Sequence, residues 1–248
     1  IWLATVVVSG ISYLSYLLKR YVFHESGTLV SGIIGGLYSS TATISVLARK
    51  SRKASEQEAT EYVAAMLLAV SMMFLRFMIL ILIFSREIFT SIYPYLLIMS
   101  VVAAVVAWFI HSRQKRPEGQ PAETEEDDSS NPLEFKVALI FATLFVVFTV
   151  LTHYTLVYAG TGGLNLLSFV SGFSDITPFI LNLLQNTGSV AVLIVVACSM
   201  QAIISNILVN MCYALFFAGK GSRLRPWILG GFGVVIACNL VLLLFFYI

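Results

Sequence analysis

The chain has 248 residues, 58% of them hydrophobic and 11% charged, with a formal net charge of +2. Soluble domains carry about 25% charged residues, so this composition predicts an integral membrane protein in contact with the lipid bilayer. The net charge is too small to indicate a nucleic-acid partner, and we expect none.

Six stretches are long and apolar enough to be transmembrane helices, since a helix needs about 20 mostly apolar residues to cross about 30 Å of hydrocarbon. The chain begins at Ile1, inside the first of them, and we expect it to be part of a longer protein. The stretches are Ile1–Leu18, Tyr62–Phe84, Ile88–Ile110, Val137–Tyr154, Ser189–Phe217 and Pro226–Ile248.

Two further apolar stretches are interrupted in the middle. Gly27–Ala48 contains Gly35-Gly36 followed by a run of hydroxyl side chains. Gly163–Gln185 contains Gly172 followed by a polar cluster, and the two interruptions align without gaps. Each half of the chain therefore has the order helix, broken stretch, helix, helix, which predicts an internal repeat.

The basic residues indicate how the broken stretches lie in the membrane, because cytoplasmic loops are enriched in Lys and Arg. If both stretches span the membrane, eight Lys and Arg residues lie on one side and six on the other. If both are re-entrant hairpins, thirteen lie on one side and Arg86 alone on the other, with Arg76 inside the membrane in either arrangement. The second distribution is far more uneven, and it favours the re-entrant arrangement.

The sequence therefore predicts an all-α integral membrane protein of two inverted repeats, each with three transmembrane helices and one broken re-entrant helical hairpin. Residues 1–112 form the first repeat, residues 113–133 a solvated acidic linker on the cytoplasmic side, and residues 134–248 the second repeat. Because each half has an odd number of spans, the hairpins enter from opposite faces and their tips meet near the midplane. Secondary transporters use such irregular backbone to line a cavity.

The hairpin tips supply the first candidate binding residues. Gly35-Gly36 and Gly172 suit a left-handed turn at the end of the first half-helix. Ser39, Ser40 and Thr41 are the three candidate caps of the first returning half, and Thr177, followed by Pro178, is the expected cap of the second. Free N–H groups of a returning half-helix favour anions, whereas the carbonyl end of the first half favours cations. The hydroxyls near the turns either bind such an ion or only satisfy the broken helix ends. They belong to Ser39, Ser40, Thr41, Ser174 and Thr177.

Two charged residues inside the membrane are further candidates. Asp175 is the only acidic residue between Glu134 and the C-terminus, and an ionised carboxylate at this depth costs about 3 kcal/mol. We expect it to carry a proton or a cation, the alternative being a helix cap. Arg76 lies eight residues from the end of its helix and should pair with a carboxylate, a carbonyl or an anionic substrate. Asp175 is its expected partner, either in the site or in a purely structural ion pair.

A polar stripe marks the helix predicted at Ser189–Phe217. Gln201, Ser205, Asn206 and Asn210 form two i, i+4 pairs, which either hold helices together in lipid or line a polar path. Asn206 and Asn210 complete the candidate site. The three cysteines lack a metal-binding spacing, so no cofactor is expected and a metal is left unassigned.

Five segments of the chain read, in order, GGLYSSTATISVLAR, MMFLRFMIL, NPLEFK, SGFSDITPFILNL and SNILVN. Together they resemble the bacterial membrane domain of unknown function that follows MgtC/SapB-type domains, and the likeness covers nearly the whole chain. The resemblance implies a multi-pass protein of the bacterial inner (cytoplasmic) membrane, normally preceded by MgtC/SapB-like helices that are absent here. It implies no substrate.

We therefore expect a secondary transporter of a small ion or polar solute, with its site at the hairpin tips. Two alternatives stay open: a non-transporting sensor or partner module for an N-terminal MgtC/SapB-like domain, and an oligomeric channel. A homodimer is compatible with each of them. An enzyme is not expected, because no histidine follows residue 153 to act as a base for Ser174 and the chain has no His-Glu-x-x-His motif.

Overall fold

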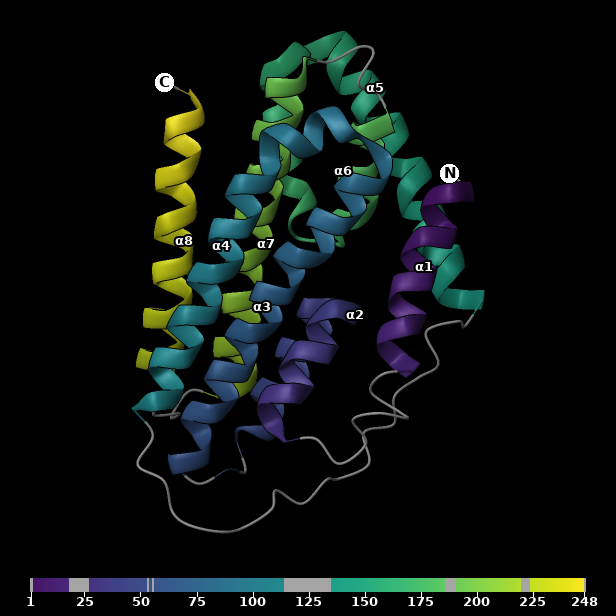
Figure 1. Ribbon diagram of the computed structural model, residues 1–248. Helices are drawn as coiled ribbons and strands as arrows, with labels where there is room; N and C mark the ends of the chain where they lie inside the picture. The colour runs from purple at the N-terminus through teal and green to yellow at the C-terminus, as the bar shows by residue number, and fades with distance from the viewer. Residues whose placement is uncertain are drawn as a thin grey trace.

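A computed structural model describes residues 2–17, 27–52, 54, 56–113, 135–185, 191–219 and 224–247. Within these ranges every regular element is an α-helix (Figure 1), which confirms the predicted all-α class. The acidic linker predicted after Arg113 lies outside the described residues. The helices are α1 (Trp2–Leu17), α2 (Thr28–Lys50), α3 (Glu56–Phe84), α4 (Arg86–Ser112), α5 (Phe135–Ser171), α6 (Ile176–Gln185), α7 (Val192–Ala218) and α8 (Arg225–Tyr247).

Six of the described helices are long and apolar enough, by length and composition, to cross a membrane. This confirms a multi-pass membrane protein, but the set is not the predicted one. The 16 residues of α1 are too few for this criterion. Helix α2 meets it because its 23 residues are counted as one helix, although the helix is interrupted at Ser39. The six segments are Thr28–Lys50, Thr60–Phe84, Arg86–Ser112, Thr143–Gly160, Val192–Ala218 and Arg225–Phe245.

Helix α2 folds back on itself at Ser39, whose φ of −157° and ψ of 108° are not helical. A Cβ atom on Gly35 would lie 2.5 Å from Thr43 Oγ1. A straight helix would separate these two residues by about 12 Å, so the arms at residues 28–38 and 40–50 pack against each other. The turn predicted at Gly35-Gly36 therefore lies three residues later.

The chain reverses a second time at Gly160, inside α5. Gly160 has φ 59° and ψ −149°, and Gly163 approaches the Thr155 side chain so closely that a Cβ on it would lie 2.8 Å from Thr155 Cγ2. A positive φ favours glycine because it lacks a Cβ atom. The helical segment 162–171 then leads to a turn at residues 172–175 and to α6.

Glycine conformation differs from the prediction at the two tips. Among the described residues only Gly160 and Gly219 have positive φ, so Gly36 and Gly172 do not form left-handed turns. Both glycines instead permit close packing. A Cβ on Gly36 would lie 2.5 Å from Ala69 Cα in α3, and one on Gly172 would lie 2.4 Å from Ser205 Cβ in α7, so any side chain at these positions would clash with those helices.

The first arm of α2 lies directly on the backbone of α3. Gly32 and Gly36 face Ala65 and Ala69, and a Cβ on Gly32 would lie 2.3 Å from the Ala65 carbonyl oxygen. Small residues four apart on both partners let two membrane helices approach this closely. The packing brings the end of the first arm, at Tyr38, beside Arg76, which lies about two turns beyond Ala69 along α3.

Neighbouring long helices run antiparallel. The hydroxyls of Ser71 and Ser100 lie 3.0 Å apart and join α3 to α4. Tyr95 on α4 donates a hydrogen bond to Asn239 on α8, while Gly231 at the start of α8 packs against Ile110 near the end of α4. Figure 1 shows that α3 and α7 at the centre run in opposite directions, as do α4 and α8.

Candidate functional site

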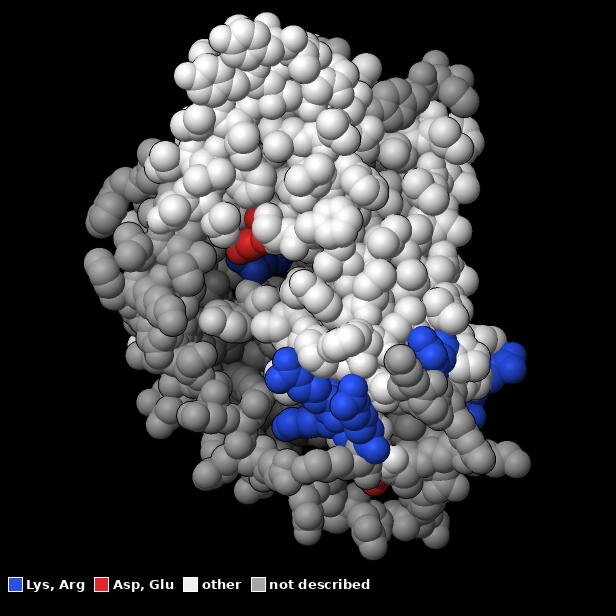
Figure 2. Space-filling model, turned by 180° about the vertical axis from the view of Figure 1, so that it is seen from behind, with Lys and Arg blue, Asp and Glu red and all other residues white. Residues whose placement is uncertain are grey.

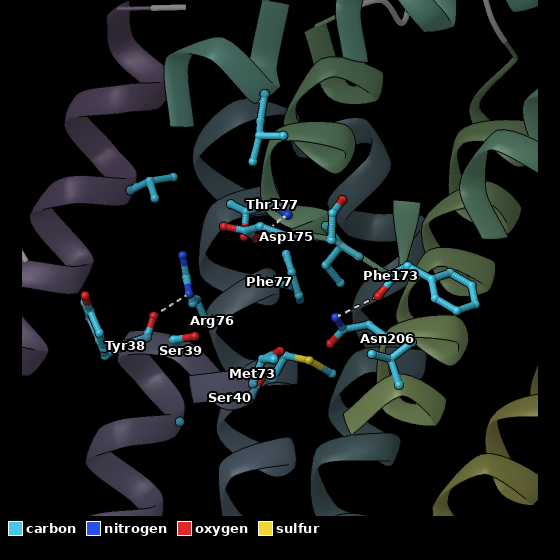
Figure 3. Close-up of a pocket in the computed structure, with 18 of the residues that line it drawn as sticks. Tyr38, Ser39, Ser40, Met73, Arg76, Phe77, Phe173, Asp175, Thr177 and Asn206 are labelled. Carbon is cyan, nitrogen blue, oxygen red and sulfur yellow. Dashed lines mark hydrogen bonds between the residues drawn. The ribbon is translucent and has the colours of Figure 1, made fainter. Parts of the chain in front are cut away.

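A cavity of about 410 Å³ lies where the turn of α2 meets the turn before α6 (Figure 3). Residues of α1, α3, α5 and α7 complete its wall. Of the twelve candidate site residues from the sequence, Gly35 and Asn210 do not line the cavity. The structure brings the other ten together in its wall: Gly36, Ser39, Ser40, Thr41, Arg76, Gly172, Ser174, Asp175, Thr177 and Asn206.

A side chain at each turn caps the returning helix. Ser39 Oγ accepts a hydrogen bond from the Ala42 N–H at 3.3 Å, and its extended backbone is the conformation of an N-cap residue. Asp175 Oδ1 accepts from the Thr177 N–H at 2.9 Å and caps α6 in the same way. Ser39 was one of three predicted caps. The prediction of Thr177 as a cap is wrong, because Thr177 lies inside α6 and its backbone donates to Asp175.

The carbonyl ends of the two incoming segments are held by side chains of α3 and α7. Arg76 Nη1 donates to the Tyr38 carbonyl oxygen at 2.7 Å. Asn206 Nδ2 donates to the Gly172 carbonyl oxygen at 3.2 Å. These donors satisfy backbone acceptors that a broken helix leaves open. Dashed lines in Figure 3 mark both bonds.

The polar stripe of α7 holds the second turn in place. Ser205 Oγ donates to the Phe169 carbonyl oxygen at 2.7 Å, next to the bond from Asn206. Asn210 is fully buried behind Asn206 and donates to its Oδ1 at 3.1 Å. The stripe therefore joins helices, and Asn206 alone of its asparagines also reaches the cavity.

The wall residues of the two halves correspond at a constant separation of 136 positions. Gly36 packs against Ala69 and Gly172 packs against Ser205, so both the glycines and their contacts are 136 positions apart. Eight pairs of cavity residues have the same separation. They are Val8 and Leu144, Gly36 and Gly172, Tyr38 and Ser174, Ser39 and Asp175, Ser40 and Ile176, Thr41 and Thr177, Met73 and Val209, and Phe77 and Tyr213.

The charged residues of the wall break this correspondence. Arg76 corresponds to Cys212, which does not line the cavity, and Asp175 corresponds to the uncharged Ser39. Arg76 and Asp175 are the only charged residues among the described residues of the wall, and Figure 3 shows their side chains near each other. Figure 2 shows an acidic and a basic side chain together in a hollow at mid-height.

Arg76 is 9% exposed, and its Nε has no hydrogen-bond partner in the part of the chain that the structure describes. The partner of its Nη1 is the Tyr38 carbonyl, one of the three kinds of partner that the sequence left open. Asp175 is exposed to the cavity and uses one carboxylate oxygen as the cap of α6. The site thus contains one buried cation, one accessible carboxylate and two helix N-termini.

Basic side chains gather at one end of the molecule, the lower end in Figure 2. Arg49 stacks over the Phe217 ring and Arg52 donates to the Phe216 carbonyl oxygen, so the end of α2 meets the end of α7 there. The antiparallel packing places Arg113 and Arg225 at the same end. Arg86, between α3 and α4, lies at the opposite end.

The described residues contain no group of three or more His, Cys, Asp or Glu side chains placed to hold a metal ion. Oxygen atoms in the cavity wall come from hydroxyls, the Asp175 carboxylate and the amide of Asn206. This set can bind a proton, a small ion or a polar solute.

The fold and the cavity define a multi-pass α-helical membrane protein with a polar chamber between two helix turns. The chain belongs to the family of the domain of unknown function DUF4010, whose profile matches residues 6–218. The chain is also 25% identical, over 227 residues, to an "Uncharacterized protein" of Aquifex aeolicus (strain VF5). That match covers 89% of this chain and 96% of the relative. No solved structure matches.

Proposed function

We propose that the protein is a secondary transporter that moves a small ion or polar solute across the bacterial inner membrane. Its binding site is the cavity between Ser39 and Asp175. The observation that carries the proposal is the pairwise correspondence of the cavity wall. Transporters built from two related halves bind their substrate at the interface of the halves, next to broken helices.

The same correspondence supports two inverted repeats. Glu56 and Val192, which begin α3 and α7, are 136 positions apart, as are the paired residues of the cavity. Equivalent helices run in opposite directions (Figure 1), as an inverted repeat requires. Alternating access then follows from rocking of one half against the other around a fixed site.

The fold-back of α2 supports a re-entrant hairpin in the first half, and the segment 162–171 with α6 is its counterpart in the second. Both turns lie at the cavity, where polar backbone is shielded from lipid. Arg49 and Arg113 lie at the basic end, which we assign to the cytoplasmic side because cytoplasmic loops are enriched in Lys and Arg. The linker between the halves is then cytoplasmic.

Asp175 is the coupling residue in this proposal. Its carboxylate reaches the cavity, whereas Arg76 is nearly buried and held by the Tyr38 carbonyl. A carboxylate that is accessible in turn from each side of the membrane can take up a proton or a cation on one side and release it on the other.

Uptake into proteoliposomes tests the proposal. Purified protein is reconstituted, proton and sodium gradients are imposed, and uptake of a panel of labelled ions and small polar solutes is measured. We expect gradient-driven uptake of at least one solute, and we expect Asp175→Asn to abolish the coupling. Asparagine keeps the cap of α6 but cannot carry the charge.

The matched control is Glu87→Gln, which neutralises an acidic residue in the first turn of α4, away from the cavity, and should leave uptake unchanged. Coupled uptake that persists in Asp175→Asn contradicts the role of this residue. The absence of uptake for every solute contradicts the transporter itself, and single-channel currents in its place would identify a channel.

A further inference from the structure

We propose that the solute bound in this cavity is a small anion, held by Arg76 and by the N-terminal end of the returning arm of α2. The inference rests on the proposed function for the role of the cavity, and it adds the sign and the chemistry of the ligand. The ligand class is a small carboxylate or inorganic oxyanion, which present the same acceptor oxygens.

Arg76 supplies the first part of the argument. Its side chain is 9% exposed and lines the cavity, and the buried Nε has no hydrogen-bond partner among the described residues. Buried donors are nearly always paired, so this N–H calls for an acceptor. Within the described ranges, one hydrogen bond, from Nη1 to the Tyr38 carbonyl, holds the guanidinium. A small shift of its free edge toward the cavity would offer a planar pair of donors to two ligand oxygens.

The returning arm of α2 supplies the second part. Its N-terminus opens on the cavity at Ser40 and Thr41, and it is capped by the neutral hydroxyl of Ser39. The partial positive charge of this helix end is therefore not compensated by a carboxylate. The equivalent helix end at α6 has Asp175 as its cap. An anion thus has one suitable helix N-terminus, the one that follows Tyr38, to whose carbonyl Arg76 donates.

The carbonyl ends of the incoming segments are evidence against a cation site. The Tyr38 carbonyl accepts from Arg76, and the Gly172 carbonyl accepts from Asn206. These are the carbonyl groups that would otherwise attract a cation at the end of each broken helix. With both occupied by donors, and with Arg76 at the wall, the α2 side of the cavity is a site for negative charge.

Asp175 is the one group of the wall that opposes an anion, and it gives the proposal its sharpest test. Among the residues that the structure describes, the titratable and charged groups that line the cavity are Tyr38 from α2, Arg76 from α3, Asp175 before α6 and Tyr213 from α7. The ionised carboxylate competes with the ligand for Arg76. Asp175→Asn removes this charge and keeps the cap, so an anion should bind more tightly and a cation more weakly.

The experiment is a binding titration of the whole chain in detergent micelles, read by thermal shift and by calorimetry at constant ionic strength. One arm varies the anion with sodium held constant: chloride, nitrate, acetate, phosphate and sulfate. The other arm varies the cation with chloride held constant: sodium, potassium and magnesium. We expect the stabilisation to follow the identity of the anion.

Two variants of the cavity wall and one control variant sharpen the result. Arg76→Lys keeps the charge but loses the planar pair of donors, and it should weaken anion binding by at least about 10-fold. Arg86→Lys, at the opposite end from the basic cluster, should leave binding unchanged. Asp175→Asn should strengthen anion binding by about 10-fold, since removing a nearby like charge is worth a factor of this order.

The outcomes separate this inference from the proposed function. Stabilisation that follows the cation and disappears in Asp175→Asn overturns the anion inference, as does the absence of any ion effect in the wild type. Uptake of a cation or a neutral solute into liposomes would support the transporter proposal and overturn the anion inference. Specific anion binding without uptake would support the anion site and overturn the transporter proposal.

Discussion

Ser39 and Asp175 occupy corresponding positions at the two turns, and each caps the helix that follows it. Both residue types are favoured N-caps because a side-chain oxygen can accept from a backbone N–H two or three positions ahead. The two caps have similar geometry. The Ser39 hydroxyl leaves the partial positive charge of its helix N-terminus uncompensated, whereas the Asp175 carboxylate adds a negative group at the N-terminus of α6. Both residues therefore have the same structural role as helix caps, but only Asp175 brings a titratable group to the cavity.

The cap at Ser39 makes a prediction at this scale. Ser39→Ala should lower the free energy of unfolding by about 1 kcal/mol, because the Ala42 N–H loses its acceptor at a broken helix end. The measurement is thermal or denaturant unfolding in detergent. Ser45→Ala is the matched control on the same arm, since the Ser45 hydroxyl only returns to the Thr41 carbonyl within the helix. An equal effect of both substitutions would contradict a capping role for Ser39.

The sequence identified most of the polar cavity residues but not all of their roles. Ser39 was one of three possible caps, and backbone geometry alone separates it from Ser40 and Thr41. Thr177 was preferred over Asp175 because Pro178 follows it. Proline is in fact tolerated throughout the first helical turn, so it does not fix the cap position. The apolar wall residues, such as Met73 and Val209, had no chemical signal of their own.

At the scale of the element, the first arm of α2 depends on glycine for packing. Gly32 and Gly36 are four residues apart and lie on Ala65 and Ala69, which are also four apart. The run of hydroxyl residues after Gly35-Gly36 favours a turn at Gly36, whereas the spacing of the small residues favours a helix contact. The small-xxx-small pattern on both helices was the signal that could have indicated the contact.

Gly36→Ala tests this contact. The added Cβ would lie 2.5 Å from Ala69 Cα, and backbone atoms cannot give way as a flexible side chain can. We expect a loss of roughly 1–3 kcal/mol in unfolding free energy, the usual range for overpacking. Gly230→Ala in α8 is the control, because nothing lies within 4 Å of its added Cβ and alanine is the better helix former. Comparable destabilisation by both would contradict the packing account.

The reversal at Gly160 was missing from the predicted elements. The sequence placed one helix end at Tyr154 and the start of the broken stretch at Gly163, with three glycines at positions 160, 162 and 163. Any of the three could have provided the turn on composition alone. The structure selects Gly160, whose φ of 59° is the conformation that a residue with a Cβ avoids.

At the scale of the whole molecule, the alignment of the two glycine-containing segments extends to other residues of the cavity wall and to the starts of α3 and α7. The separation of 136 positions relates the starts of α3 and α7, the glycine contacts and eight pairs of cavity residues. Apolar helices resemble one another too closely in composition for sequence to establish this register beyond the polar turns. Contacts such as Gly36 with Ala69 provide the register, since they are repeated by Gly172 with Ser205.

The distribution of charge belongs to the same scale. Five described basic residues lie at one end of the bundle, at the ends of α2 and α4 and the start of α8, and Arg86 lies at the other. The expected arrangement of thirteen against one also counts residues outside the described ranges. The described basic residues are unevenly distributed in the same sense as the expected arrangement. In our proposal this asymmetry places the basic end in the cytoplasm.

The central claim is that both ends of α2 open on the same side of the membrane, so that its turn reaches the cavity from that side. Cysteine labelling in sealed inverted and right-side-out vesicles measures this directly, with the native Cys198, Cys212 and Cys238 replaced by serine. Single cysteines are introduced as Thr28→Cys, Lys50→Cys and Arg86→Cys. We predict that a membrane-impermeant maleimide reaches positions 28 and 50 from the cytoplasmic side only, and position 86 from the other side only. Labelling of positions 28 and 50 from opposite sides would mean that α2 spans the membrane, and it would contradict the account.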